Sequence, residues 1–244
     1  MSTDTLSEVL RAVRLKGAVF FDVDASAPWV AETPPGRDVA PHIMPGVEHV
    51  IEYHVLTSGS CYGGLLGEPA VRMQAGDVIV FPQGDPHVMS SAPGMRNDPE
   101  LAAFESALTH RLPIAIDYHG GGPERAQLIC GFIGCDARPF NPLLSALPRV
   151  LHVPRRDAED GVIEQFVRVA LAESRVERAG SECVLARLSE LLFVEVVRRY
   201  LAALPPENAG WLAGLRDESI GRVLGKLHAQ PTHAWSLELS LIHI

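Results

Sequence analysis

The chain has 244 residues, of which 47% are hydrophobic and 21% charged, a composition typical of a globular protein with a sizeable core. Its formal net charge of −9 repels phosphate backbones and argues against nucleic-acid binding through the overall field. No apolar run reaches the length of about 18 residues that a membrane span needs. Four cysteines without a CxxC pair, and an N-terminus without a signal-peptide pattern, predict a cytoplasmic protein with reduced thiols.

The first third of the chain predicts one short helix followed by strands. Thr5 or Ser7 can cap the helix, because a side-chain oxygen there can accept from the first free backbone N–H groups. Residues 17–24 change to a strand pattern, with a partner strand expected from Trp29. Residues 33–38 contain two prolines and a glycine, and are expected to form a loop.

The longest strand is predicted over residues 50–57. Side chains alternate across a strand, so its residues divide into two sets. One face carries Glu52, His54 and Leu56, and the other carries Ile51, Tyr53 and Val55. We expect Ser58–Ser60 to turn the chain and residues 61–66 to run back along it.

Residues 76–87 form the stretch around which the chain is organised. Val78–Phe81 is a buried-strand pattern, Pro82 ends it, and His87 opens the next strand after a turn at Gly84. The order of Gly, five residues, Pro, one residue, Gly, two residues and His resembles the second motif of the cupin superfamily, whose closing Asn is Ser91 here. The resemblance implies a small β-barrel, with His87 pointing into its mouth.

The stretch between this motif and residue 155 gives weaker patterns. A short helix is expected over 99–108, and residues 114–118 and 127–134 are predicted to pair as a hairpin. Gly120–Gly122 lie at its tip. Consecutive glycines can form a phosphate-binding nest, but no Lys-Ser/Thr follows as a phosphate loop requires, so a flexible hairpin tip is the alternative.

After residue 155 the pattern is helical, with helices predicted over 162–176, from Ser181 to about 204, and from about Asp217. The centre of the second helix, residues 191–197, is apolar almost all round and therefore needs burial on every side. That burial can come from a second subunit, giving a homodimer, or from the same chain.

The chain from about residue 6 to 238 resembles an AraC-family transcriptional regulator with a cupin-type N-terminal domain. The segments that carry the resemblance are 15–21, 53–61, 120–124, 141–148, 187–194 and 210–217. In that family the last segment opens a DNA-binding region of two helix-turn-helix units, and Trp235–Glu238 would begin its next helix. Residues 239–244 depart from the family's pattern, and we interpret them as a truncation, a frameshift or a sequence artefact. DNA reading is therefore expected of the full-length parent and not of this polypeptide.

The sequence is compatible with two kinds of site in the barrel, a metal site and an effector pocket. Enzymatic cupins resemble one another in an HxH pair and a Glu in the first motif, followed by the second-motif His. Here Gly46 and Glu48 stand where the HxH histidines should fall, which leaves Glu52, His54 and His87 as a weak metal-ligand set.

The alternative to a metal site is a metal-free barrel that binds a small effector. His54 and His87 would then be polar groups of the pocket, or ordinary packing histidines. Trp29 and Tyr62 are candidates for its wall, although each can equally be plain core.

We therefore expect a mainly β plus α protein: a cupin-like barrel (double-stranded β-helix) followed by α-helices. The expected domains are an effector-binding domain at 1–153, a helical dimerisation segment at 154–208 and the start of a helix-turn-helix domain at 209–244. The expected function is transcription regulation by an AraC-family homodimer without a cofactor, whose partners are a small-molecule effector and, for the full-length parent, promoter DNA. A metal-dependent cupin dioxygenase or isomerase is the alternative.

Overall fold

The computed structural model describes residues 5–13, 15–99, 101, 104, 113–135, 142–155, 161–174, 178–205, 210–230 and 232–236. The strands are β1 (Lys16–Ser26), β2 (Val30–Thr33), β3 (His49–Leu65), β4 (Val71–Gln74), β5 (Val78–Phe81), β6 (His87–Ser90), β7 (Ile114–His119), β8 (Arg125–Cys135) and β9 (Leu151–Val153). The helices are α1 (Thr5–Val13), α2 (Gly36–Ile43), α4 (Pro142–Ala146), α5 (Val162–Ser174), α6 (Ser181–Ala203), α7 (Trp211–Arg216) and α8 (Glu218–Ala229).

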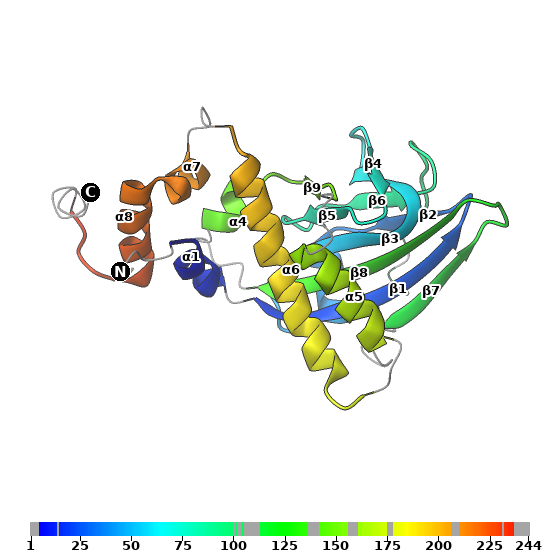
Figure 1. Cartoon of the computed structure of the whole chain (residues 1–244), viewed down its shortest axis with the longest axis horizontal. Helices are drawn as coiled ribbons and strands as arrows, with labels where there is room; N and C mark the ends of the chain where they lie inside the picture. Colours follow the sequence, from blue (N-terminus) through cyan, green and yellow to red (C-terminus); the bar gives the residue numbers. More distant parts are fainter. Residues whose placement is uncertain are drawn as a thin grey trace.

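The strands form one curled, branching sheet, and α5 and α6 lie across one of its faces (Figure 1). The main strand order is β2-β6-β3-β8-β1-β7, with β4 and β5 also paired to β3 and β9 paired to β5. All described strands lie between residues 16 and 153, and only helices follow in the described part of the chain. The prediction of a barrel-like β region followed by α-helices is confirmed. The division into three domains stays a prediction.

The central strand β3 is longer than predicted. It continues through Ser58–Ser60, where a turn was expected, and only shifts register between Leu56 and Ser58. Its first half pairs with β8 and β5, and its second half pairs with β4 and β6. Gly59 has φ +79°, and a side chain there would overlap the backbone of Arg125 on β8. The glycine thus serves a close strand approach, which looks the same in sequence as a turn.

The predicted hairpin of residues 114–118 and 127–134 is wrong, because β1 lies between the two strands. β7 pairs with β1 in parallel and β8 pairs with β1 antiparallel. The linking glycines wrap around the end of β1: Gly120 N–H donates to Ser26 O (2.9 Å) and Gly122 N–H donates to Ala27 O (2.7 Å). These N–H groups are bonded to the chain itself, so the phosphate-nest alternative is wrong as well.

Three further local predictions need correction or fall outside the described residues. The loop expected at 33–38 becomes α2 from Gly36, because Gly36 N–H donates to Gly84 O (2.8 Å) and a side chain at Gly36 would collide with Val50. The helix expected over 99–108 and the tail at 239–244 lie almost wholly outside the described residues. Asp217 caps α8 as expected for a helix beginning there, since its Oδ1 accepts from Ser219 N (2.9 Å) and Ile220 N (2.8 Å).

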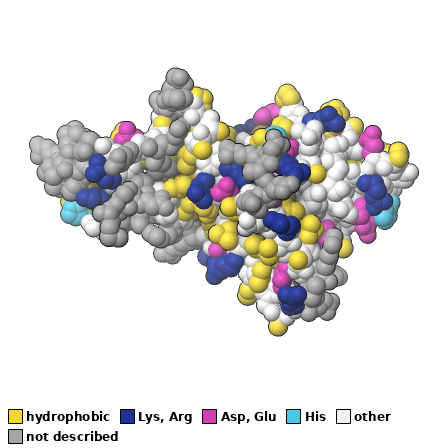
Figure 2. Space-filling view, viewed as in Figure 1, with side chains coloured by type: hydrophobic (Ala, Val, Ile, Leu, Met, Phe, Trp, Pro, Cys, Tyr) yellow, Lys and Arg dark blue, Asp and Glu magenta, His cyan; other side chains and the backbone are white. Residues whose placement is uncertain are grey.

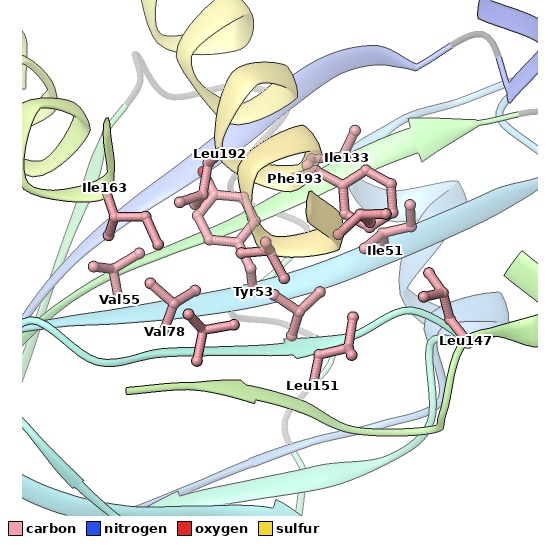
Figure 3. Close-up of a cluster of buried hydrophobic side chains, with 14 of the residues drawn as sticks. Ile51, Tyr53, Val55, Val78, Ile133, Leu147, Leu151, Ile163, Leu192 and Phe193 are labelled. Carbon is pink, nitrogen blue, oxygen red and sulfur yellow. The ribbon is translucent and has the colours of Figure 1, made fainter. Parts of the chain in front are cut away.

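The apolar side chains form two cores on opposite faces of the sheet. The helix-side core lies between the sheet and the helices, and Figure 3 shows part of it, with Tyr53 of β3 directed toward α6 beside Leu192. The barrel core lies inside the curled sheet and includes Phe21, Leu56 and Phe132. The predicted alternation of β3 is confirmed. Ile51, Tyr53 and Val55 enter the helix-side core, while Leu56 enters the barrel core and Glu52 and His54 are buried.

The apolar centre of α6 is covered mostly by its own chain. Leu192 and Val196 are 1% and 0% exposed, so at these two positions the same chain supplies the burial, which is the second of the two alternatives. Leu191 is 59% exposed, and Val184 on α6 and Val169 on α5 are also exposed. Figure 2 shows hydrophobic side chains gathered in the middle of the view, over the region of α5 and α6 in Figure 1. None of the described helices is both long and apolar enough to cross a membrane.

Candidate functional site: a cavity in the barrel

The barrel core encloses a cavity of about 220 Å³. Its walls come from β1, β2, β3, β6, β7 and β8 and from the segment after β6. The lining residues are Phe21, Val23, Trp29, Ala31, Glu32, Thr33, His54, Met89, Asn97, Asp98, Phe104, Ile116, Tyr118, Leu128, Cys130 and Phe132. A cavity of about 150 Å³ suffices for a benzene-sized molecule, so this one can hold a ring with a substituent.

Aromatic rings make up much of the cavity wall. Phe21, Phe104 and Phe132 pack edge-to-face, with ring centroids 5.8 to 6.0 Å apart. Trp29 stacks on Tyr118 at 6.0 Å. Aromatic pairs in these arrangements are stabilising beyond their buried area, so these contacts stabilise the wall of the cavity.

Trp29 is fixed by its backbone. Its N–H donates to Ser91 Oγ (3.0 Å), and its carbonyl accepts from Ser91 N–H (3.0 Å). Ser91 is the residue that stands in place of the Asn closing the resembled motif. Its hydroxyl thus has a structural use here: it positions the strand that carries a cavity wall.

An ion pair holds the mouth of the cavity. Arg96 donates from Nε and Nη2 to the two carboxylate oxygens of Glu32, both at 2.8 Å, and Asn97 N–H donates to Glu32 Oε2 (3.3 Å). These hydrogen bonds tie the segment that carries Asn97 and Asp98 to β2. They also lower the pKa of Glu32, so this carboxylate is ionised at neutral pH.

A buried polar cluster lies behind the cavity wall. His54 Nε2 is 2.7 Å from His87 Nε2, and His87 Nδ1 is 3.0 Å from the backbone oxygen of Asp85. A carbonyl only accepts, so His87 carries its proton on Nδ1 and accepts at Nε2 from His54. The His87 ring stacks on Phe81 at 3.8 Å. The two histidines are therefore held by an internal network, which sets the orientation of the His54 ring.

Burial keeps this cluster uncharged at neutral pH. It raises the pKa of Glu52 well above the ordinary range of a carboxyl group. Burial lowers the pKa of His87 to about 4, and burial together with the nearby His87 lowers the pKa of His54. No described residue hydrogen-bonds to either Glu52 oxygen or to His54 Nδ1. The His54 ring therefore presents a neutral polar group to the cavity.

The cluster does not fit a bound metal ion in this arrangement. Two nitrogens that ligate one tetrahedral ion at about 2.0–2.1 Å lie about 3.3 Å apart. The Nε2 atoms of His54 and His87 are closer, at hydrogen-bond distance, and Glu52 Oε2 is 3.7 Å from His87 Nε2. Within the part of the chain that the structure describes, no group of His, Cys, Asp or Glu side chains is arranged to hold a metal.

The predicted site residues lie at different positions relative to the cavity. Trp29 and His54 line the cavity, His87 is fully buried behind His54, and Tyr62 is not among the described residues of the lining. Phe104, Tyr118 and Cys130 line the cavity although sequence reasoning missed them. Tyr118 and Cys130 lie on β7 and β8, and no sequence signal showed that β1 brings these strands together.

A hydrogen bond connects the strand of the cavity wall to helix α6. Tyr53, the residue before His54, makes a buried 2.6 Å hydrogen bond from its phenol to Ser189 Oγ. Its ring also packs edge-to-face on Phe166 of α5, with centroids 6.5 Å apart. Neighbouring residues of β3 therefore contact the cavity on one face and the helices on the other.

Comparison with known proteins identifies the family. The cupin family model matches residues 4–202. An AraC-like transcription regulator of Streptomyces antibioticus is 30% identical over 237 residues, covering 96% of this chain and 72% of that protein. Another from Streptomyces lividans is 25% identical over 237 residues, covering 96% and 71%.

A solved structure of unsaturated fatty acid bound ToxT from Vibrio cholerae has a TM-score of 0.40. It is 8% identical, over 92% of this chain and 68% of that one, too low a similarity for residues to be matched. The curved sheet with its covering helices, the cupin match and the relatives together show that this chain belongs to the AraC-like transcription regulators and carries their cupin domain.

Proposed function

We propose that this chain is the effector-sensing part of a transcription regulator. The cavity in the barrel binds a small molecule, and the resulting change in β3 reaches α6. The observation that carries the proposal is the position of β3, which has His54 in the cavity wall and Tyr53 bonded to Ser189 of α6. A ligand that moves one residue of a strand also moves its neighbour, so both faces respond together.

The finer parts of the proposal rest on the family. The chain spans about seven tenths of the length of the two Streptomyces relatives, so promoter DNA is proposed as the partner of a longer protein of this kind, acting in the cytoplasm. A homodimer is proposed through the exposed stripe of α6 that includes Val184 and Leu191.

The metal-dependent enzyme is the weaker alternative. Three groups expected for a cupin metal site do converge, but the 2.7 Å contact between the histidines is that of a hydrogen bond. Elemental analysis distinguishes the two readings. About one equivalent of iron, manganese, nickel or zinc per chain, lost in a His87→Ala variant, would favour the metal-dependent enzyme.

The proposed function is tested by ligand binding to the cavity and its effect on α6. A panel of small molecules of mixed charge is screened by thermal shift on the wild type, on Ala31→Phe, which fills the cavity, and on Tyr62→Phe as the matched control. A true effector stabilises the wild type and Tyr62→Phe but not Ala31→Phe. In hydrogen exchange it slows the amides of α6, and this effect is lost in Tyr53→Phe. Ligands that bind Ala31→Phe equally well would exclude the cavity.

A further inference from the structure

We infer that the ligand of the cavity is an uncharged compact molecule with an aromatic ring and a hydroxyl or N–H donor, and that this donor pairs with Nδ1 of His54. This inference rests on the proposed function and adds the chemical class of its effector. It follows from the proton positions in the buried histidine pair, from the walls and from the charges of the lining.

The proton positions of the histidine pair make His54 Nδ1 an acceptor. His87 donates from Nδ1 to the backbone oxygen of Asp85 (3.0 Å), so its Nε2 accepts the Nε2 proton of His54 (2.7 Å). Burial lowers the pKa of both histidines, so each ring is neutral at neutral pH and carries one proton. The proton of the His54 ring is therefore on Nε2, and Nδ1 keeps its lone pair.

The lone pair of His54 Nδ1 has no partner in the described part of the chain. His54 lines the cavity, and its Nε2 is directed to His87, which is 0% exposed. The two nitrogens of an imidazole point to different sides of the ring, so Nδ1 faces away from this partner. Nδ1 is itself buried, so a ligand donor reaches it when the ring turns slightly toward the cavity. A buried acceptor without a partner is costly, and a ligand hydroxyl or N–H satisfies it.

The walls favour a ring that carries this donor. Phe21, Phe104 and Phe132 form an edge-to-face group, and Trp29 stacks on Tyr118. All five rings line the cavity. An aromatic guest adds contacts of the same kind, and a cavity of about 220 Å³ suits one ring with a small substituent.

The charges of the lining favour an uncharged ligand. Cys130 pairs opposite His54 on β8, and burial raises the pKa of its thiol, so this part of the wall is neutral. Glu32 is already paired with Arg96, and Asp98 belongs to the exposed segment at the mouth. Among the described lining residues there is no Lys or Arg to receive a carboxylate. A charged group brought against His54 would lose its hydration without gaining an opposite charge.

Four probes of similar size test the inference by calorimetry at neutral pH: p-cresol, its isomer anisole, p-xylene and benzylamine. Only p-cresol combines a ring, a donor and no charge, since a phenol ionises only near about pH 10. Anisole and p-xylene, which lack a donor, should bind about 3- to 10-fold more weakly, the usual effect of one neutral hydrogen bond. Benzylamine, which is protonated at this pH, should bind at least about 100-fold more weakly than p-cresol.

Two substitutions of His54 separate hydrogen bonding from shape. His54→Leu removes the acceptor and should bring the affinity for p-cresol within about 2-fold of that for p-xylene. His54→Gln keeps an amide N–H for His87 and a carbonyl acceptor for the ligand, and should retain a preference for p-cresol. Tyr62→Phe, which lies outside the described lining, should leave these ratios unchanged.

Nitrogen NMR of the wild type tests the proton assignment without any variant. The Nδ1 resonance of His54 should have the shift of an unprotonated nitrogen and should move upfield when p-cresol binds. If His54→Leu does not fold, this resonance and the wild-type affinities decide.

A proton on His54 Nδ1 in the free protein would overturn the inference. So would an unchanged p-cresol preference in a folded His54→Leu variant, anisole or benzylamine binding as tightly as p-cresol, or failure of all four probes to bind. In those cases the proposed function still stands if the mixed panel yields a ligand that Ala31→Phe excludes, and it falls separately if the panel yields none.

Discussion

The side chains on the two faces of the central sheet are packed in different ways. The helix-side core is filled with aliphatic side chains and the buried rings of Tyr53, Phe166 and Phe193, and the buried hydrogen bond discussed above joins Tyr53 to Ser189. The barrel core keeps a cavity and buries Glu52 and both histidines. A single strand, β3, supplies residues to both. A protein can thus use one face of a sheet for stability and leave the other face incompletely packed for a ligand.

The largest expected effect is a charge placed in the helix-side core. Val196→Asp puts an unpaired carboxylate where the side chain is 0% exposed, and should lower the free energy of unfolding by about 4–5 kcal/mol or more. Leu191→Asp, on the same helix but exposed, should change stability by less than about 0.5 kcal/mol. Urea titrations measure both. A Val196→Asp variant with the stability of the wild type would contradict a helix-side core that is tightly packed for stability.

The barrel core should make stability depend on pH through its buried groups. The pKa of Glu52 is raised, so above about pH 4.5 the unfolded chain ionises while the folded carboxyl stays neutral, and stability is lost as pH rises toward the folded pKa. His87, whose pKa is lowered to about 4, has the opposite effect on stability, which falls as pH decreases below about 6.5.

Above that pH, the contribution of Glu52 should therefore fall by about 1.4 kcal/mol per pH unit up to its folded pKa. Glu52→Gln should flatten this dependence, whereas Glu124→Gln on the exposed turn should keep it. Equal slopes in wild type and Glu52→Gln, measured by urea unfolding between pH 6.5 and 8.5 (about two units), would show that Glu52 is not held neutral.

A smaller effect tests the hydrogen bond between the faces. Tyr53→Phe removes the phenol that bonds to the Ser189 hydroxyl, and Ser189→Ala removes the hydroxyl that bonds to the phenol. Each substitution should therefore lower the free energy of unfolding by about 1–3 kcal/mol. The double variant should cost less than the sum, because both groups of the pair are then gone. Additive losses in this double-mutant cycle would mean that the hydrogen bond does not couple β3 to α6.

The smallest effect compares the packing of the two cores directly. Val55→Leu adds a methylene to the filled core and should destabilise by about 1–3 kcal/mol. Val23→Leu makes the same change in the wall of the cavity, where there is room, and should cost less than about 0.5 kcal/mol. Thermal unfolding of the two variants provides the comparison, and a larger cost for Val23→Leu would contradict an open cavity.

Sequence reasoning found what is local and periodic. The alternation along β3, the strand at Val78–Phe81 and the start of a helix near Asp217 each depend on neighbouring residues, and each was predicted. The insertion of β1 between β7 and β8 depends on contacts about a hundred residues apart, and the local pattern of the two strands looks like a hairpin.

The candidate site shows the same division. Trp29 and His54 could be proposed from their residue types, and both line the cavity. Tyr62 was proposed as a wall residue but does not line the cavity in the described structure. Its position follows from the change in the pairing of β3, from β8 to β6, which the sequence does not reveal. The ion pair between Glu32 and Arg96 spans 64 positions and has no local signature.

The position of α1 has a consequence for the order of folding. This helix packs against α8, more than two hundred residues later in the chain, and against α4. During synthesis its apolar side chains, such as Val9 and Val13, are made well before α8 but find their full covering only after α8 has emerged from the ribosome. Contacts of such sequence separation form slowly because a long loop must close first. Helix α1 is therefore among the later elements to dock, and until then its hydrophobic face is open to chaperones or to aggregation.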